Sequence, residues 1–275
     1  MLHSVRELKK YTIGATDGMI GDITDFYFDD EAWVIRYLEV DTGTWLSGRR
    51  VLISPFSIGV ADRAARVFSV SISKEQIKHS PGIDTDKPVS RQHEKGYLSY
   101  YCYPHYWGGS GFWGDGAYPR MMLPGSGYGE EDVDRLRAQA SNAAIVAEAD
   151  KERLPDEDPH LRSCNAVAHY HVHASDGDIG HVEGFLVEEK SWAIRYIIVN
   201  TSNWWMGHQV LVAPEWIGEV SWSYQKITVS LSRRAIKDAP AYHADRPLDR
   251  DEETALYTHH RHRGYWQEEN ERAVS

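Results

Sequence analysis

Two clusters of histidines carry the residue types best suited to chemistry. The segment HYHVH places His169, His171 and His173 at every second position. Because side chains alternate across a β-strand, the three imidazoles are expected on one face of a strand, where they could hold zinc, nickel or copper. The alternative is a partly exposed strand whose histidines only meet solvent. We expect no resident cofactor, with a transition metal at these histidines as the competing hypothesis.

The second cluster lies near the C-terminus, in THHRHRGYW, and adds His259, His260 and His262. This segment is expected to form a flexible cationic tail, with a site for a metal or an anionic partner as the alternative. The string GSGFWG at 109–114 matches a dinucleotide-binding pattern, but that pattern needs a strand before it and a helix directly after it. Aromatic residues surround it here, so we reject a nucleotide site.

Two arginines interrupt runs of apolar residues. Arg36 lies in AWVIRYLEV and Arg195 in SWAIRYIIV. A buried guanidinium needs a carboxylate or carbonyl partner, and Glu39 or Asp41 could serve Arg36, so a structural role is expected for both arginines. The chain has no Ser-His-Asp spacing, no phosphate-binding loop and no hydrolase-like Cys or Glu/His set, and no catalytic residue is predicted. The protein is expected not to be an enzyme.

Both arginines belong to an internal repeat. Asp17 corresponds to Asp176 and Trp33 to Trp192, each time with an offset of 159 residues. Residues 2–88 align with residues 161–247 without a gap, and 30 of those 87 positions are identical. Two copies separated by a long insert do not stack as a solenoid does. The chain is therefore predicted to contain a duplicated domain.

Each copy is patterned as a series of short strands. GDITDFYF and VFSVSI alternate between apolar and polar residues, whereas AWVIRYLEV is apolar on both faces and is expected to be a central, covered strand. Ser73 and Gln76 have the spacing of a capping box before a short helix. The glycines are expected to have structural roles. Gly18 and Gly177 are predicted at a turn that needs positive φ, and Gly21 and Gly180 at a bend of the sheet. Short strands with frequent turns favour a small barrel or sandwich.

The stretch DGMIGDITDFYFDDEAWVIRYLEVDTG, followed by RRVLISPFSI and FSVSISKEQIKHSP, resembles the PRC-barrel domain. This family takes its name from the cytoplasmic part of the photosynthetic reaction centre H subunit, and the barrel also occurs in the C-terminal half of the ribosome-maturation factor RimM. The resemblance covers about residues 1–90 and 160–250. It implies a mainly β protein with two small antiparallel PRC-like β-barrels. The residues between the barrels are predicted to form an aromatic, glycine-rich loop and an α-helical linker. No catalytic residue is shared across the family.

The predicted organisation has three parts. Residues 1–110 form the first PRC-like domain, 111–158 the loop and linker helix, and 159–275 the second domain with its His/Arg-containing tail. The aromatic stretch 96–129 is expected to fold back over its own barrel, or alternatively to present Tyr106, Trp107, Phe112 and Trp113 as an interaction arm. The linker helix begins near Glu130, with an apolar stripe from Val133 to Ala147.

Composition limits the function classes. The net charge of −11 disfavours binding to nucleic acid, the two cysteines are too few for a disulfide framework, and no stretch is long and apolar enough to insert directly into a membrane. We therefore expect a cytoplasmic scaffold or adaptor that assembles proteins, peripheral to the inner membrane where its partner is a membrane complex. The resemblance implies a photosynthetic complex of the light reactions and electron transport as one candidate partner, and self-association as another. Alternatives are a metal- or small-ligand-binding protein and a RimM-like ribosome-associated factor.

Overall fold

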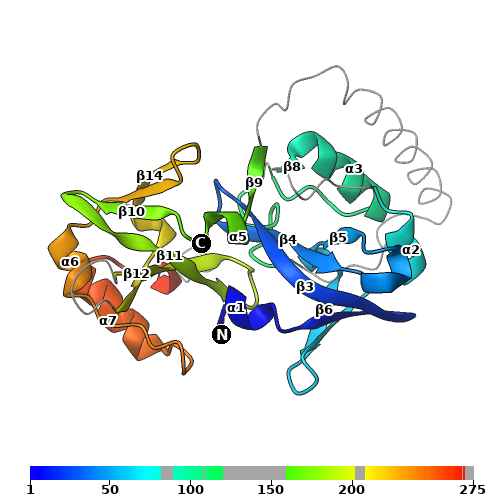
Figure 1. Ribbon diagram of the computed structural model, residues 1–275, viewed down its shortest axis with the longest axis horizontal. Helices are drawn as coiled ribbons and strands as arrows, with labels where there is room; N and C mark the ends of the chain where they lie inside the picture. The colour runs from blue at the N-terminus through cyan, green and yellow to red at the C-terminus, as the bar shows by residue number, and fades with distance from the viewer. Residues whose placement is uncertain (82–88, 108, 120–158, 202–207, 268, 270–275) are drawn as a thin grey trace. The chain divides into compact units, whose positions relative to one another are not determined.

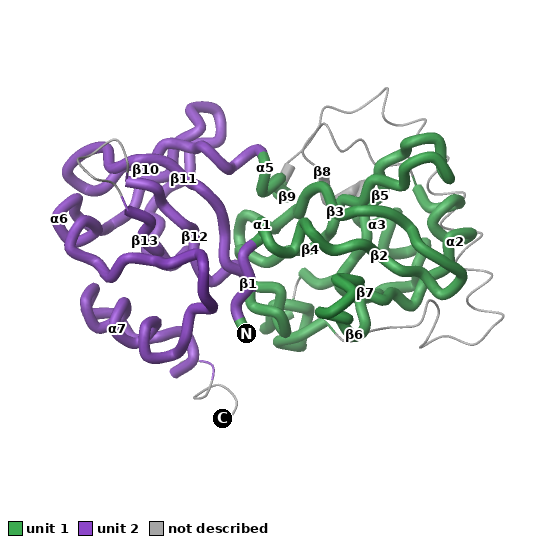
Figure 2. The backbone as a smooth tube through the Cα atoms, turned by 60° about the horizontal axis from the view of Figure 1, so that its bottom comes forward, with its two compact units in different colours: residues 1, 5–165, 188–193 green, residues 2–4, 166–187, 194–275 purple. Residues whose placement is uncertain are grey.

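The protein is mainly β-structure, and its elements recur at the 159-residue offset found in the sequence. The computed structural model describes residues 1–81, 89–107, 109–119, 159–201, 208–267 and 269 (Figure 1). Two compact units result. Unit 1 comprises residues 1, 5–165 and 188–193, and unit 2 comprises residues 2–4, 166–187 and 194–275 (Figure 2). The predicted linker helix from Glu130 lies outside the described residues.

Unit 1 is built on a mixed sheet. Its strands follow the order β5-β4-β3-β2-β7-β6, and β9 pairs with both β3 and β8. The strands are β2 (Thr12–Ala15), β3 (Gly18–Asp29), β4 (Val34–Asp41), β5 (Arg50–Ile53), β6 (Ile58–Asp62), β7 (Val67–Val70), β8 (Val89–Ser90) and β9 (Pro159–Ser163). The helical elements are α1 (Val5–Leu8), η1 (Gly43–Leu46), η2 (Pro55–Ser57), α2 (Lys74–Lys78), α3 (Arg91–Tyr101) and the start of α5 (Cys164–Val167).

Unit 2 repeats this sheet. Its order is β13-β12-β11-β10-β15-β14, and β1 pairs with β11. The strands are β1 (Leu2–Ser4), β10 (His171–Ala174), β11 (Gly177–Glu188), β12 (Ile194–Asn200), β13 (Gln209–Val212), β14 (Ile217–Ser221) and β15 (Lys226–Val229), and the helical elements are η3 (Pro214–Trp216), α6 (Arg233–Lys237) and α7 (Arg250–His260).

Several local predictions are confirmed. The apolar strand around Arg36 is β4, which lies between β3 and β5 and is buried along all but its last residue. Ser73 and Gln76 form the capping box at the start of α2. Gly21 is required by contact, because a Cβ there would lie 1.8 Å from the Asp41 carbonyl oxygen, and Gly180 has the same relation to Asn200 at 1.9 Å. These bends therefore keep neighbouring strands in close approach.

Other predictions need correction. The sheets are mixed rather than antiparallel, because β2 pairs with β7, and β10 with β15, in parallel. A closed barrel is not detected in the part of the chain that the structure describes. The stretch 96–101, read as loop, belongs to helix α3, and the predicted C-terminal tail begins inside helix α7. Both helices were missed because short polar segments with scattered aromatics have weak helical periodicity, and packing against the sheet stabilises them. No helix among the described residues is long and apolar enough to cross a membrane.

Candidate functional site

Arg36 of β4 is buried in unit 1, with 2% of its surface exposed. Its guanidinium donates to Asp29 Oδ2 at 3.2 Å and to the Phe112 carbonyl at 2.5 Å. The same group lies over the Tyr106 ring, 3.8 Å from its centroid, and 4.8 Å from the Trp113 ring centroid. The predicted partners Glu39 and Asp41 are wrong. Burial lowers the pKa of Arg36, while Tyr106 and Asp29 oppose that shift and keep the cation compensated.

A carboxylate from helix α3 completes this arrangement. Glu94 is fully buried, and its Oε1 accepts a hydrogen bond of 2.5 Å from the Tyr106 hydroxyl. The Nε2 atom of His160, on β9, lies 2.6 Å from the other carboxylate oxygen. Burial, and then the charge of Glu94, raise the pKa of Tyr37 and of Tyr106 well above the ordinary tyrosine value. Both tyrosines are therefore neutral at physiological pH, and Tyr106 donates to Glu94.

Unit 2 contains the same arrangement 159 residues later. Arg195 lies over the Tyr265 ring, 4.0 Å from its centroid, and donates to Glu269 at 2.5 Å. Glu253 of α7 accepts hydrogen bonds from Tyr196 at 2.9 Å and from Tyr265 at 3.0 Å. Burial raises the pKa of Glu253, while these hydrogen bonds and nearby cations oppose the shift. In each unit the residues that follow the repeat form a helix with a buried glutamate and then a Tyr-Trp segment. Contacts of the glutamate and the tyrosine with an arginine and neighbouring residues of the sheet hold this extension in place.

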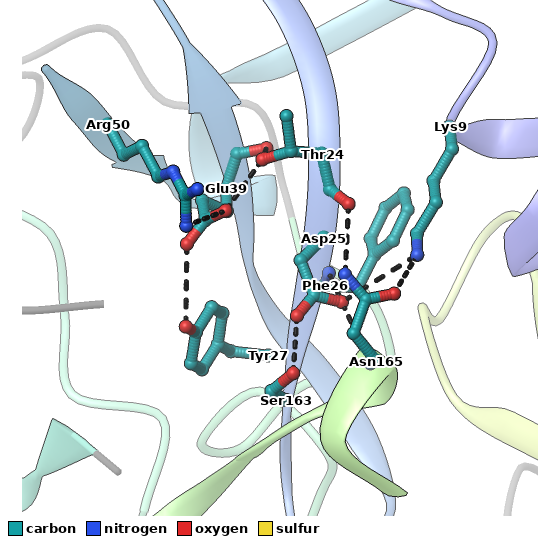
Figure 3. A network of polar contacts seen from close by, with 9 residues as sticks. All are labelled: Lys9, Thr24, Asp25, Phe26, Tyr27, Glu39, Arg50, Ser163 and Asn165. Atoms are coloured by element: carbon teal, nitrogen blue, oxygen red, sulfur yellow. Dashed lines mark hydrogen bonds and ion pairs between the residues drawn. The ribbon is translucent and has the colours of Figure 1, made fainter. Parts of the chain in front are cut away.

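A second polar network exists in unit 1 and is centred on Asp25 of β3 (Figure 3). Its side chain is 4% exposed and accepts hydrogen bonds from the Ser163 hydroxyl and from the Asn165 backbone amide, the latter at 3.1 Å. The Asn165 amide group in turn donates to the Thr24 carbonyl at 3.2 Å and accepts from Lys9. Burial raises the pKa of Asp25, and the Ser163 hydrogen bond opposes that shift first. This network attaches the segment Pro159–Asn165 to strand β3.

Glu39 lies directly opposite Asp25 in the β3–β4 register. It accepts from the Thr24 hydroxyl at 2.6 Å and from the Tyr27 hydroxyl at 3.4 Å, and Arg50 lies 3.6 Å away. Paired carboxylates can serve acid–base chemistry, but here different protein donors bind each of them (Figure 3). The arrangement is typical of carboxylates that hold chain segments in place.

The network around Asp25 and Glu39 is specific to the first repeat. At the equivalent positions of the second repeat stand Gly184 and Ile198, and Ala168 replaces Lys9. Sequence reasoning missed Asp25, although an acidic residue on the inward side of an apolar strand was a detectable signal. The partners Ser163 and Asn165 are far away in the chain and gave no such signal.

The comparison with known families recognises part of the first repeat. The sequence from residue 3 to residue 77 matches the profile of the PRC-barrel domain. Residues 3–77 are a PRC-barrel domain. No curated protein matches the chain. Arg36, Asp25 and Glu39 belong to the PRC-barrel domain, whereas Glu94, Tyr106 and the segment Pro159–Asn165 that contact them lie outside the match.

The predicted interaction residues lie within the same unit as the PRC-barrel domain. Tyr106 and Trp113 are buried, and the Trp113 indole nitrogen donates to the Ser191 carbonyl at 2.8 Å. Trp107 is half-buried and stacks on His105 with ring centroids 4.5 Å apart, and Phe112 is half-buried. The described part of the loop therefore folds back over its own unit.

The three histidines of the predicted metal site have different environments. His169 precedes β10 with a φ of 79°, and its ring stacks on His181 at 6.2 Å. His171 is exposed, and His173 bonds through Nδ1 to Asp178 at 2.6 Å. No group of three or more His, Cys, Asp or Glu side chains suited to a metal ion is found in the residues that the structure describes.

Replacing Asp25 with alanine is expected to weaken the attachment of β9 to the PRC-barrel domain. The Ser163 hydroxyl and the Asn165 amide would lose their acceptor, at a cost of about 1–3 kcal/mol. Hydrogen exchange at the backbone amides of residues 161–163 should accelerate. Asp22→Ala on the same strand is the control, because Asp22 is exposed. Equal acceleration in both variants would contradict the assigned role of Asp25.

The C-terminal histidines were predicted to lie in a flexible cationic tail, and this prediction is wrong for His260. Its side chain is 9% exposed at the end of α7 and packs on Trp216, with ring centroids 4.8 Å apart. His262 also packs on Trp216, at 5.4 Å, and His259 Nε2 lies 2.8 Å from the Ala235 carbonyl. Burial first, and then His259 and His262, lower the pKa of His260 to about 4. The imidazole is neutral at physiological pH.

Unit 2 is therefore expected to lose stability in acid through His260. The folded-state pKa is below the unfolded value, so the stabilisation is complete above about pH 6.5 and decreases as the pH falls toward 4. The slope is at most about 1.4 kcal/mol per pH unit and less with partial solvation. The difference between the melting temperatures at pH 7 and pH 5 should be smaller in His260→Tyr than in the wild-type protein. Tyrosine is chosen because Tyr101 stands at the corresponding position of the first repeat. An unchanged difference would exclude His260 as the source.

Proposed function

We propose that this protein is a non-enzymatic scaffold or adaptor that assembles proteins through two PRC-like domains, the second formed by the repeat at residues 161–247. The observation that carries the proposal is the completion of unit 1 by a strand from the other repeat. Strand β9 pairs with β3 of the PRC-barrel domain, and Asp25 binds the segment that follows β9. A domain that uses backbone pairing to bind a peptide segment performs the elementary step of an adaptor.

The polar residues of the domain support a binding role over a catalytic one. Arg36, Glu94, Asp25 and Glu39 are each bonded by other groups of the same unit. The hydrogen bonds that these residues form attach chain segments to the sheet. The network thus favours assembly, and no reaction is assigned to it.

The sheet also ends in strands suited to pairing. In the strand order of unit 1, β6 is terminal, and its residue Val60 is 84% exposed. Terminal strands offer backbone donors and acceptors to an added strand. A partner that contributes an extended segment is therefore the kind that this domain suits, and a membrane complex of the reaction-centre type is one candidate.

The test is retention of partners from lysate of the native organism at low and moderate salt, followed by mass spectrometry and rebinding of each purified candidate. Gly21→Ala and Gly180→Ala baits perturb unit 1 and unit 2 separately, and Gly184→Ala is the matched control. A protein that rebinds the wild-type and control baits, but not one of the perturbed baits, is the expected result. Absence of any rebinding protein would overturn the proposal, and retention of ribosomal RNA alone would replace it with a ribosome-associated role.

A further inference from the structure

The first strands of the two repeats are exchanged between the units. Strand β1, which begins the first repeat, pairs with β11 and belongs to unit 2. Strand β9, which begins the second repeat, pairs with β3 and belongs to unit 1 (Figure 2). Residues 2–4 correspond to residues 161–163 at the 159-residue offset. Each unit is thus completed by a strand that the sequence assigns to the other repeat.

The position that receives β9 is built into unit 1. The strand runs antiparallel to β3, with Leu161 opposite Asp29 and Ser163 opposite Tyr27, and β8 pairs with its other edge. The Leu161 side chain is fully buried. A strand paired on both edges and anchored by a buried leucine is an integral part of the unit.

Charge and hydrogen bonding determine the register of this segment. Arg162 donates to Asp30 Oδ2 at 2.7 Å, and both side chains are largely buried, with 17% and 13% exposed. Ser163 and the Asn165 amide donate to Asp25. Asp30 and Asp25 together form the acidic acceptor of unit 1. This acceptor matches a segment that supplies a cation and two further hydrogen-bond donors.

The acceptor distinguishes the two homologous segments. In the first repeat His3 and Arg6 stand at the positions of Arg162 and Asn165. An arginine at the position of Asn165 could not accept the hydrogen bond of Lys9 and would add a second cation beside it. The acceptor on β3 consequently fits Pro159–Asn165 better than it fits the beginning of its own repeat.

We propose that this acceptor also takes the segment Pro159–Asn165 from a second copy of the chain, so that two copies associate by reciprocal exchange of β9. The contacts are the same whether the segment comes from the same or another molecule, and such exchange is a low-cost route to dimers. The inference rests on the proposed assembly role and names a second copy as the partner. Within one molecule the segment has the advantage of effective concentration, so exchange is expected when the internal pairing is weakened or when chains fold together at high concentration.

The test uses complementary charge reversals in the full-length chain. Asp30→Arg impairs the acceptor and Arg162→Asp impairs the segment, so each variant opposes like charges within one molecule. In a mixture, Arg162 of one variant can meet Asp30 of the other, and the two reversed residues can pair as well. The mixture should contain at least about ten times more dimer than either variant alone. A tenfold increase corresponds to a dimerisation free energy that is more favourable by about 1.4 kcal/mol. The double variant, which restores the pair internally, should remain at the wild-type level.

Light scattering after size-exclusion chromatography distinguishes a chain of 31.4 kDa from a dimer. Equal amounts of dimer in the mixture, the single variants and the double variant would overturn the inference. Should a variant fail to fold, wild-type chains carrying donor and acceptor fluorophores are refolded together at high concentration. Energy transfer is then expected between wild-type chains and not between wild-type chains and the double variant, and its absence in both cases would overturn the inference. A dimer without a captured lysate protein supports exchange alone, and a captured protein without a dimer supports the adaptor role alone.

Discussion

Replacing Arg36 with alanine is expected to destabilise unit 1 by about 3–5 kcal/mol. The change removes the cation that neutralises buried Asp29 and leaves a cavity beneath the rings of Tyr106 and Trp113. The Phe112 carbonyl loses its donor at the same time. Urea unfolding, followed by hydrogen exchange at the amides of β4, measures the loss in unit 1 separately from unit 2.

The matched control is Arg63→Ala. Arg63 also pairs with a carboxylate, that of Glu189 at 2.8 Å, but its side chain is 51% exposed. Exposed pairs contribute little because water competes for both charges, so only a small change is expected. Similar losses in the two variants would show that burial and ring stacking are not what makes Arg36 important. Arg36→Met tests the charge separately, because methionine fills space while the Asp29 carboxylate still loses its cation.

Replacing Gly180 with alanine is expected to destabilise unit 2 by about 3 kcal/mol or more. The new Cβ would lie 1.9 Å from the Asn200 carbonyl oxygen and 3.2 Å from the Thr201 Cα. Both are backbone atoms, so the clash can be relieved only by separating β11 from β12. The melting temperature of unit 2 and the hydrogen exchange of the β11–β12 amides report this separation.

Gly184→Ala on the same strand provides the comparison. A Cβ at Gly184 would meet only the end of the Ile198 side chain, at 3.7 Å, which is an ordinary contact. Alanine there also reduces the conformational entropy of the unfolded chain, so little change or slight stabilisation is expected. A loss in Gly184→Ala as large as that in Gly180→Ala would mean that adding a Cβ to either glycine of β11 destabilises the unit. The close approach of β11 and β12 at Gly180 would then not be the cause.

The features that sequence predicted well are those controlled by neighbouring residues or by the repeat. The strands, the capping box of Ser73 and the glycine bends depend on alternation, local hydrogen bonding and the absence of a Cβ. Each of these properties is present in a few adjacent residues. The recurrence of the same pattern at 159 residues predicted in advance that the second half would repeat the sheet.

The features that sequence missed depend on residues far apart in the chain. The burial of Arg36 was evident from its apolar surroundings, but its partner could not be chosen among several nearby acids. Asp29 was selected because the β3–β4 hairpin brings it to the guanidinium, and Tyr106 arrives from beyond α3. The C-terminal histidines likewise looked solvated until Trp216 provided a surface for His260.

The sequence alone determined a duplicated, mainly β protein with a PRC-like pattern, two buried arginines and glycines at equivalent bends. Only the tertiary structure decided that the first strands of the repeats are exchanged, that β2 and β7 run parallel, and that Asp25 binds the segment Pro159–Asn165. The physical reason is that strand pairing uses backbone groups common to every residue. A local pattern therefore specifies which residues form a strand, whereas the choice of neighbour depends on packing and buried polar contacts across the whole unit.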